Sequence, residues 1–269
     1  MLKRINVLLL IVFALSLFSC SKYNKMIKNA DINQKYTIAI DLYNKGDYVR
    51  ALPLFEELMT VFKGTEKAQN VYYYYAYTNY NVGDYVLAGY HFHAFAKLYP
   101  NSPHAEECEY MYAYCYYLDS PVYSLDQTDT KTAIQAFQEF ADKFPNSDKL
   151  SKCNQMMDIL RAKLERKEYE NAKLYFYIED YKSAIVALKN VIKDYPDIKQ
   201  KEEVNFLIVK CNYLLAINSI EQKKPERLQN TVNAYLKFVD LFPQSTYLKS
   251  AEQIYNNTLK EQGKIKKQS

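Results

Sequence analysis

The sequence is poor in glycine and histidine, and this scarcity excludes several kinds of functional site. Only 5 of 269 residues are glycine, which excludes the glycine-rich loops that cradle phosphate groups. His91 and His93 are two positions apart on a predicted helix and cannot face one metal ion, and His104 stands at a helix start. The sequence also lacks paired carboxylates, a nucleophile motif and metal-ligand spacing. We therefore expect a non-enzyme with no cofactor and no metal.

The chain also lacks paired cysteines. None of Cys108, Cys115, Cys153 and Cys211 forms a Cys-x-x-Cys pair. On one helix, Cys108 and Cys115 would lie about two turns apart, which is beyond disulfide reach. We expect all four to be buried thiols that pack as small apolar side chains.

No charge of one sign dominates. The formal net charge is +4, and Lys3 and Arg4 at the amino terminus supply two of these charges. No basic run carries the interleaved aromatic residues of a nucleic-acid groove. The lysines of residues 260–269 are consistent with a solvated end. We therefore expect no nucleic-acid partner.

The amino terminus has the pattern of a signal peptide. Lys3 and Arg4 precede an apolar run at residues 5–18. This run is too short to span a bilayer comfortably, and polar chain follows it. It is therefore interpreted as a targeting segment and not as a transmembrane anchor.

The end of this segment resembles a bacterial lipobox. Leu17 and Ser19 precede Cys20, so residues 1–19 are expected to be removed and Cys20 to be lipidated. More than one acyl chain on one cysteine gives stable membrane attachment. An ordinary secretory signal with an incidental cysteine is the alternative.

The residues after Cys20 indicate the membrane to which the lipoprotein is sorted. Residue 21 is serine and not aspartate, which by resemblance to lipoprotein sorting in Gram-negative bacteria favours the outer membrane. Residues 21–28 hold three lysines and no acidic residue, so they lack an acidic signal for export to the cell exterior. We expect a lipid-anchored protein on the periplasmic face of the outer membrane.

One short phrase recurs along the rest of the chain. It consists of an aromatic residue, a proline and a helix-capping residue. The prolines are Pro100, Pro145, Pro196 and Pro243, and Lys63 replaces the proline in a degenerate fifth copy. Proline cannot continue a helix, and the Asn, Ser or Asp that follows it can cap the next one. The phrase therefore predicts repeated helix ends.

Small and bulky residues stand at fixed distances before these positions. Twelve residues earlier the chain has Ala51, Ala88, Ala133, Ala184 and Thr231. Eight residues earlier it has Phe55, Phe92, Phe137, Leu188 and Tyr235. This spacing is typical of the tetratricopeptide repeat, a helix pair of roughly 34 residues. We predict an all-α tetratricopeptide-repeat superhelix of about five helix pairs plus a closing carboxy-terminal helix.

Two segments make the predicted repeats longer than the usual length of roughly 34 residues and divide the series into two blocks. A loop at residues 120–130 is expected inside the third repeat, and a long helix at residues 149–178 before the fourth. The expected segments are a signal peptide (1–19), a lipidated tether (20–31), a three-repeat block (32–148), a long connecting helix with a two-repeat block (149–256) and a basic tail (257–269).

Tyrosine is abundant, with 28 copies and no tryptophan in the chain. Tyr72, Tyr75 and Tyr112 are expected to pack in the core. Other tyrosines fall on one stripe of the first helix of each of three repeats. These are Tyr36, Tyr43, Tyr73, Tyr77, Tyr80, Tyr110, Tyr114 and Tyr117.

Stacked helices would combine these stripes into one concave aromatic groove. Tyrosine offers a large contact area, a polar tip and few rotatable bonds, which suits peptide binding. An extended or aromatic-ended peptide is the expected ligand. The alternative is that the rings only fill space within a curved array.

A lipobox followed by five such repeats resembles the BamD-type (YfiO/ComL) family of outer-membrane assembly lipoproteins. The most specific match is residues 126–147, where an aspartate-containing loop precedes an Ala-x-x-x-Phe helix and a Phe-Pro-Asn-Ser end. Residues 163–177 are similar to the first helix of the family's fourth repeat. The resemblance covers essentially the whole mature chain.

This resemblance implies a role in the β-barrel assembly machinery, with the chain monomeric inside a hetero-complex. The carboxy-terminal repeats would bind the POTRA domains of BamA, and the amino-terminal repeats would receive unfolded outer-membrane proteins. Leu214 follows Tyr213 where the family carries an arginine, so the family's ion pair to BamA does not carry over. Another periplasmic repeat scaffold, such as a Tol–Pal-associated cell-division coordinator, is the alternative, although its usual coiled coil is not visible before residue 32.

Overall fold

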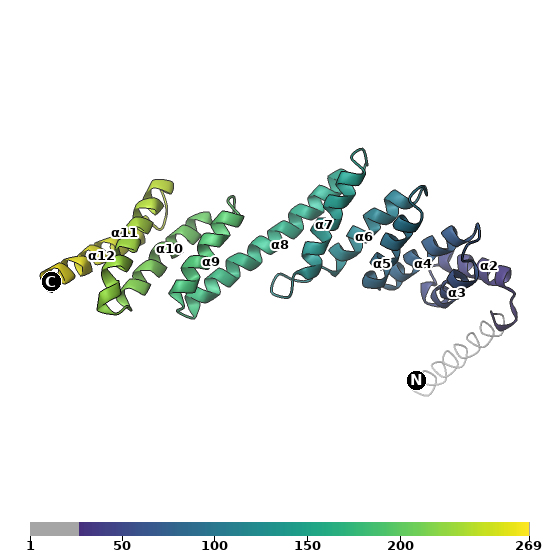
Figure 1. Ribbon diagram of the computed structural model, residues 1–269, viewed down its shortest axis with the longest axis horizontal. Helices are drawn as coiled ribbons and strands as arrows, with labels where there is room; N and C mark the ends of the chain where they lie inside the picture. The colour runs from purple at the N-terminus through teal and green to yellow at the C-terminus, as the bar shows by residue number, and fades with distance from the viewer. Residues whose placement is uncertain (1–26, 269) are drawn as a thin grey trace, which may run out of the picture. The chain divides into compact units, whose positions relative to one another are not determined.

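A computed structural model describes residues 27–268, which fold into helices joined by short connections (Figure 1). The helices are α2 (Ile32–Asn44), α3 (Tyr48–Val61), α4 (Ala68–Val82), α5 (Tyr85–Leu98), α6 (Ala105–Asp119), α7 (Thr128–Lys143), α8 (Leu150–Tyr177), α9 (Tyr181–Asp194), α10 (Lys201–Ile217), α11 (Lys224–Leu241) and α12 (Leu248–Gln268), with a short 3₁₀ helix, Glu221–Lys223, before α11. Within residues 27–268 no strand forms, and no helix is long and apolar enough to cross a membrane.

The helices form the predicted pairs, α2/α3 to α10/α11, and α12 closes the series. Successive helices pack on each other from α2 to α7 and from α9 to α12, and α2 also contacts α4, as α10 contacts α12. At the two ends of the series, the first helix of a pair therefore touches the helix two positions along the chain. The predicted all-α tetratricopeptide-repeat fold is confirmed.

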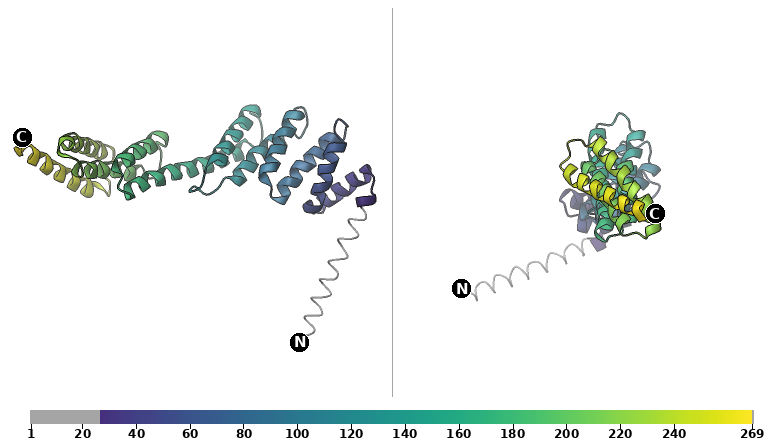
Figure 2. Two further views of the ribbon diagram at one scale, coloured as in Figure 1. Left: turned by 60° about the horizontal axis from the view of Figure 1, so that its bottom comes forward. Right: turned by 90° about the vertical axis from the view of Figure 1, so that its left-hand side faces the viewer.

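The described residues divide into two compact units, each visible from further sides in Figure 2. The first holds the residues up to Ser120 and Thr128–Met157; the second holds Pro121–Gln127 and the residues from Asp158. Helix α8 therefore contributes its first residues to the first unit and the rest to the second. Helix α12 continues to Gln268, so the segment expected to be a basic tail is helical.

The loop of the third repeat is shorter than expected, because α6 ends at Asp119 and α7 begins at Thr128. It packs on the second half of α8. The Lys167 ammonium donates to the Leu125 carbonyl at 2.6 Å, and the Arg166 guanidinium lies 4.1 Å from the centre of the Tyr123 ring. These contacts explain why the loop belongs to the second unit.

The recurring small and bulky positions form the core. The small residues Ala51, Ala88, Ala133, Ala184 and Thr231 are all 0% exposed, as are Phe55, Phe92, Phe137 and Leu188 among the bulky ones. Small side chains let two helices approach, and the bulky ones fill the space beside them at interior packing density. Tyr235 is the exception. It is half-buried and stacks on Tyr255 of α12 with ring centres 4.4 Å apart.

Asp47, Asp84 and Asp180 begin the second helices of three pairs. Each is an N-cap whose carboxylate accepts a backbone N–H three residues later, a contact typically worth about 1 kcal/mol. Gly83 precedes Asp84 with φ of 89°, and Glu179 takes the equivalent place before Asp180 with φ of 63°. The fourth pair therefore places a glutamate in a left-handed conformation that favours glycine.

The serine of the proline phrase has a different role from the predicted cap. The N-cap of α6 is His104, which makes no side-chain cap bond. Ser102, Ser147 and Ser245 instead accept the backbone N–H two residues later. Each also bonds to the second residue of the preceding first helix, and we call these contacts serine bridges. The pairs are Ser102 with Gln69, Ser147 with Glu106, and Ser245 with Glu202.

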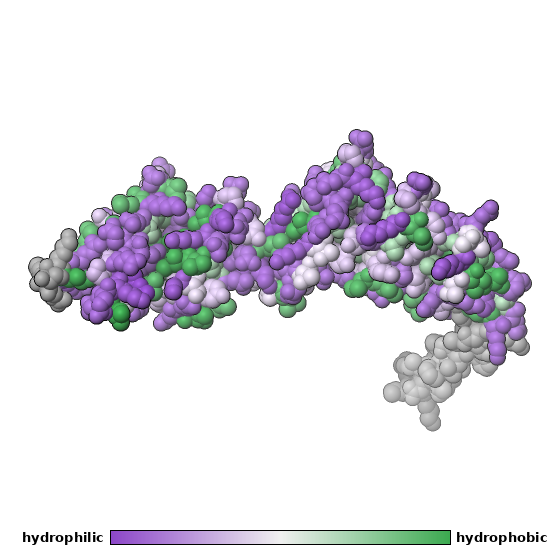
Figure 3. Space-filling view, viewed as in Figure 1, coloured by the Kyte–Doolittle hydropathy of each residue, from purple (hydrophilic) through white to green (hydrophobic). Residues whose placement is uncertain are grey.

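The four described cysteines are buried and free, as predicted. Burial raises the pKa of the Cys115 and Cys211 thiols to about 12 and that of Cys153 to about 11. The thiols therefore stay protonated at neutral pH and pack as small apolar groups. On the face shown in Figure 3, polar side chains predominate and apolar ones form small separate patches.

Candidate peptide-binding site

Six of the eight tyrosines predicted to line a groove form one series of ring contacts. Tyr73 and Tyr77 have ring centres 4.8 Å apart, Tyr77 and Tyr80 6.3 Å, and Tyr80 and Tyr114 6.4 Å. Tyr114 in turn stacks on its α6 neighbours Tyr110 and Tyr117, each 5.9 Å away. The three rings of α4 thus continue into the three rings of α6.

Tyr74 links this series to the first repeat. Its ring centre lies 5.7 Å from that of Tyr73 and 4.9 Å from that of Tyr43 on α2. Tyr36, the eighth predicted residue, contacts Phe62 at 5.9 Å. We call the nine residues the tyrosine array: Tyr36, Tyr43, Tyr73, Tyr74, Tyr77, Tyr80, Tyr110, Tyr114 and Tyr117.

The rings of the array are neither sealed in the core nor fully in solvent. Tyr110 is 7% exposed, and the other eight are half-buried. On their inner side they pack on core phenylalanines: Tyr77 lies 4.8 Å from Phe92, and Tyr110 lies 5.9 Å from Phe140. The array therefore fills space within the first unit and also presents aromatic surface.

Of Tyr72, Tyr75 and Tyr112, which we expected in the core, only Tyr72 is buried, with 8% of its surface exposed. Tyr75 and Tyr112 are half-buried and lie against histidines of α5. Tyr75 is 4.7 Å from His91, and Tyr112 stacks on His93 at 4.2 Å. These three rings face α5 and are separate from the tyrosine array.

One carboxylate fixes two rings of the array. The Tyr73 hydroxyl donates to Glu107 Oε2 at 2.9 Å, and the Tyr77 hydroxyl donates to Glu107 Oε1 at 2.5 Å. Burial, and then these bonds to an anion, raise the pKa of both phenols above the ordinary range. Glu107 on α6 thereby holds the tyrosines of α4 in one orientation.

A pocket of about 310 Å³ opens beside the array between α2 and α4. Tyr36, Ile40 and Tyr73 line it, together with His104 at the start of α6. The His104 ring stacks on Tyr73 at 4.1 Å. Pockets of roughly 300 Å³ are at the small end of those that hold ligands, and this one has room for an aromatic side chain.

Lysines stand at both ends of the array. The Lys67 ammonium lies 5.1 Å from the ring centre of Tyr36. At the other end, the Lys152 ammonium lies 5.4 Å from Tyr114 and 5.7 Å from Tyr110. Cations over aromatic faces stabilise the rings in place and leave positive charge next to an aromatic surface.

Tyr74 and His104 were missed by the sequence analysis, which weighed His104 only as a metal ligand. Within residues 27–268 no group of His, Cys, Asp and Glu side chains is arranged to hold a metal ion. Cys20, Leu17 and Ser19, predicted for lipid attachment, lie outside the described residues.

Comparisons with known proteins identify the family. A family model described as "YfiO: Outer membrane lipoprotein" matches residues 28–228. No curated protein matches the chain. Among solved structures, the TPR domain of P58(IPK) shares 14% identity over 88% of this chain and 68% of its own, with a TM-score of 0.42. The TPR2AB domain of yeast Sti1, solved with pHSP90, shares 14% identity over 84% of this chain and 98% of its own, with a TM-score of 0.41. The family match spans most of the sequence, and the chain belongs to the YfiO family of outer membrane lipoproteins.

Proposed function

We propose that this protein is the BamD-type lipoprotein of a β-barrel assembly machinery. Lipid on Cys20 anchors it to the periplasmic face of the outer membrane. The amino-terminal repeats receive unfolded outer-membrane proteins, and the carboxy-terminal repeats bind the POTRA domains of BamA. The role is one of binding, without catalysis. Membership of the YfiO family and the repeat fold support this proposal.

The tyrosine array is the observation that carries the client-binding part. It runs across the first helices of three successive repeats, α2, α4 and α6. Half-buried tyrosines give an extended chain apolar area and hydroxyls at low entropic cost. An aromatic side chain of the client would enter the pocket beside Tyr36, Tyr73 and His104. Lys67 over Tyr36 would pair with the carboxylate of a client that ends there.

The BamA contact is assigned to residues 149–256 by family resemblance. All nine residues of the array lie in the predicted client-binding block, residues 32–148, which leaves residues 149–256 for BamA. Leu214 is half-buried and cannot form the ion pair that the family's arginine makes. The contact therefore depends on other residues of this segment.

A binding experiment tests the array. The probe is a labelled peptide of alternating apolar and polar residues that ends in phenylalanine. We expect Tyr36→Leu/Tyr73→Leu to weaken its binding at least about tenfold, or ~1.4 kcal/mol, with helicity unchanged. Amidation of the carboxy terminus should weaken binding to the wild type as well.

Tyr90→Leu is the matched control, because Tyr90 is 63% exposed on α5 of the same unit and outside the array. Wild-type affinity in the double variant, or an equal loss in the control, would show that the array only fills space.

Affinity capture tests the assembly. From detergent-solubilised outer membranes, the lipidated protein should recover BamA, and Cys20→Ser should leave the outer-membrane fraction. Recovery of Tol–Pal components without BamA would contradict the proposal and favour the cell-division alternative.

A further inference from the structure

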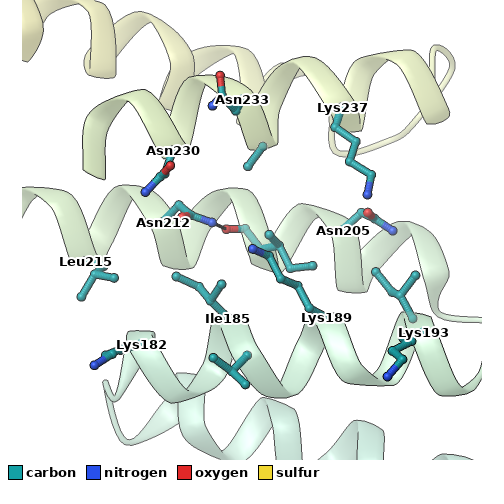
Figure 4. A pocket seen from close by; sticks show the side chains of 14 residues that line it. Lys182, Ile185, Lys189, Lys193, Asn205, Asn212, Leu215, Asn230, Asn233 and Lys237 are labelled. Carbon is teal, nitrogen blue, oxygen red and sulfur yellow. Dashed lines mark hydrogen bonds between the residues drawn. The ribbon is translucent and has the colours of Figure 1, made fainter. Parts of the chain in front are cut away.

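The second unit contains a pocket of about 740 Å³ that is unrelated to the tyrosine array. It opens between α9, α10 and α11, with α10 as its floor (Figure 4). Its volume falls within the range of roughly 300 to 1,000 Å³ typical of ligand sites. No aromatic residue lines it.

Every charged side chain that lines this pocket is a lysine. Lys182, Lys189 and Lys193 line the α9 wall, and Lys237 lines the α11 wall. Spacings of seven and four place the α9 lysines on one face of their helix. In Figure 4, Lys189 and Lys237 reach into the space from opposite walls.

These charges are not compensated within the pocket. No aspartate or glutamate lines it. Among residues 27–268, none of the four lysines forms an ion pair with a carboxylate. All four are exposed. Such a concentration of positive charge attracts an anionic partner.

The floor adds hydrogen-bonding groups suited to a polypeptide. Asn205 and Asn212 are 6% and 8% exposed. The side-chain nitrogen of each donates to a backbone carbonyl four residues earlier, at 2.8 and 2.7 Å. The remaining amide oxygen is an acceptor, which suits a backbone N–H of a bound chain. Asn230 and Asn233 supply further amides from the α11 wall.

Apolar side chains lie between the lysines. Val186 of α9 is 56% exposed and Leu215 of α10 is half-buried, whereas Ile185 and Ile208 are each 8% exposed. A hydrated phosphate or a lipid headgroup would leave this surface uncovered, whereas an aliphatic side chain would bury it.

We propose that this pocket binds an acidic segment of a partner protein, in which carboxylates flank an aliphatic side chain. The carboxylates pair with Lys189 and Lys237, the aliphatic group covers Val186 and Leu215, and the segment's backbone meets the floor asparagines. This inference rests on neither the tyrosine array nor the identity of the partner, and it assigns residues and a chemistry to the carboxy-terminal repeats.

The test uses the full chain and a fluorescein-labelled peptide with the core sequence Glu-Glu-Leu-Glu-Glu. Fluorescence anisotropy should show saturable binding that weakens with added salt, because exposed charges are screened. Lys189→Gln/Lys237→Gln should weaken binding at least about tenfold, since it removes one cation from each wall.

Lys249→Gln/Lys260→Gln is the matched control, because it removes the same charge from exposed positions on α12 outside the pocket. Its affinity should equal that of the wild type. Replacing the central leucine of the peptide with serine, or its glutamates with glutamine, should also weaken binding.

Four outcomes would overturn the proposal: no saturable binding of the acidic peptide, an equal loss in both double variants, equal affinity for the glutamine peptide, or binding only to phosphatidylglycerol vesicles. The aromatic-ended peptide that tests the array should bind Lys189→Gln/Lys237→Gln as it binds the wild type. The two proposals can therefore fail separately.

Discussion

Among single residues, Glu107 connects two helices of the first unit through its two carboxylate oxygens. It accepts from Tyr73 and Tyr77, which lie one turn apart on α4. A phenol whose bond partner is an anion is harder to ionise, because ionisation would place two negative charges together. Burial acts in the same direction and raises the pKa of Tyr43 and Tyr72 to about 12.

Glu107→Gln should lower the pKa of Tyr73 and Tyr77, because glutamine keeps the shape of the side chain and removes its charge. Loss of two charge-assisted bonds at a partly exposed site should reduce the free energy of unfolding by about 1 kcal/mol. The measurement is a pH titration of ring-labelled tyrosine signals by NMR, with Tyr73→Phe to assign them. Unchanged titration of both phenols would exclude the role given to Glu107.

At the scale of helices, each serine bridge joins the turn before one helix to the first turn of a helix two positions earlier. In the third repeat, Ser147 Oγ donates to Glu106 Oε1 at 2.6 Å and accepts the Lys149 N–H at 3.2 Å. One hydroxyl thus forms a hydrogen bond within its own turn and a second hydrogen bond to another repeat.

Ser147→Ala should lower the free energy of unfolding by about 1 to 2 kcal/mol, because two hydrogen bonds are lost and one of them is to a carboxylate. Ser151→Ala is the control, since Ser151 is exposed on α8 and takes part in no serine bridge. Denaturant unfolding compares the two variants. Equal midpoints would mean that the bridge contributes nothing to stability.

The helices themselves could be predicted from the sequence, because the spacing of Ala88, Phe92 and Pro100 repeats along the chain and determines which residues are buried. The serine bridges could not, since Ser147 and Glu106 are 41 residues apart and their contact depends on how the pairs stack.

The candidate site, like the fold, could be predicted only in part from the sequence. Spacings of three and four along α4 and α6 placed Tyr73, Tyr77 and Tyr114 on one surface. Tyr74 is adjacent to Tyr73 in a run of four tyrosines, and only the packing of its ring on Tyr43 shows that it joins the array. His104 was missed because its partner is a ring on another helix.

For the whole molecule, the raised pKa values of Tyr43 and Tyr72 predict that stability falls at alkaline pH. A phenol whose pKa rises from 10.0 to about 12 on folding, as for Tyr43 and Tyr72, keeps its proton in the folded chain after the unfolded chain has lost it. Stability is therefore fully present below pH 10 and falls as pH rises towards 12.

Thermal melts followed by circular dichroism across this range should show a declining melting temperature. In Tyr43→Phe/Tyr72→Phe the decline should be shallower, because two titrating groups are absent. A melting temperature that stays constant up to pH 12, or an identical slope in the double variant, would contradict the assignment.

Family membership and fold together do not identify what each surface binds, because function depends on particular side chains placed on a common scaffold. The two units differ in this respect. The first presents aromatic rings, and the second presents a pocket lined by lysine and asparagine. The whole chain therefore offers two chemically distinct candidate binding surfaces.

The tyrosine array also has an optical consequence. The chain has no tryptophan, so the excitation energy of these phenols cannot pass to an indole within the same protein. A client that brings one to the array would receive that excitation and emit at longer wavelength. Capture could then be followed in real time from the emission of the client, with no dye attached to either protein.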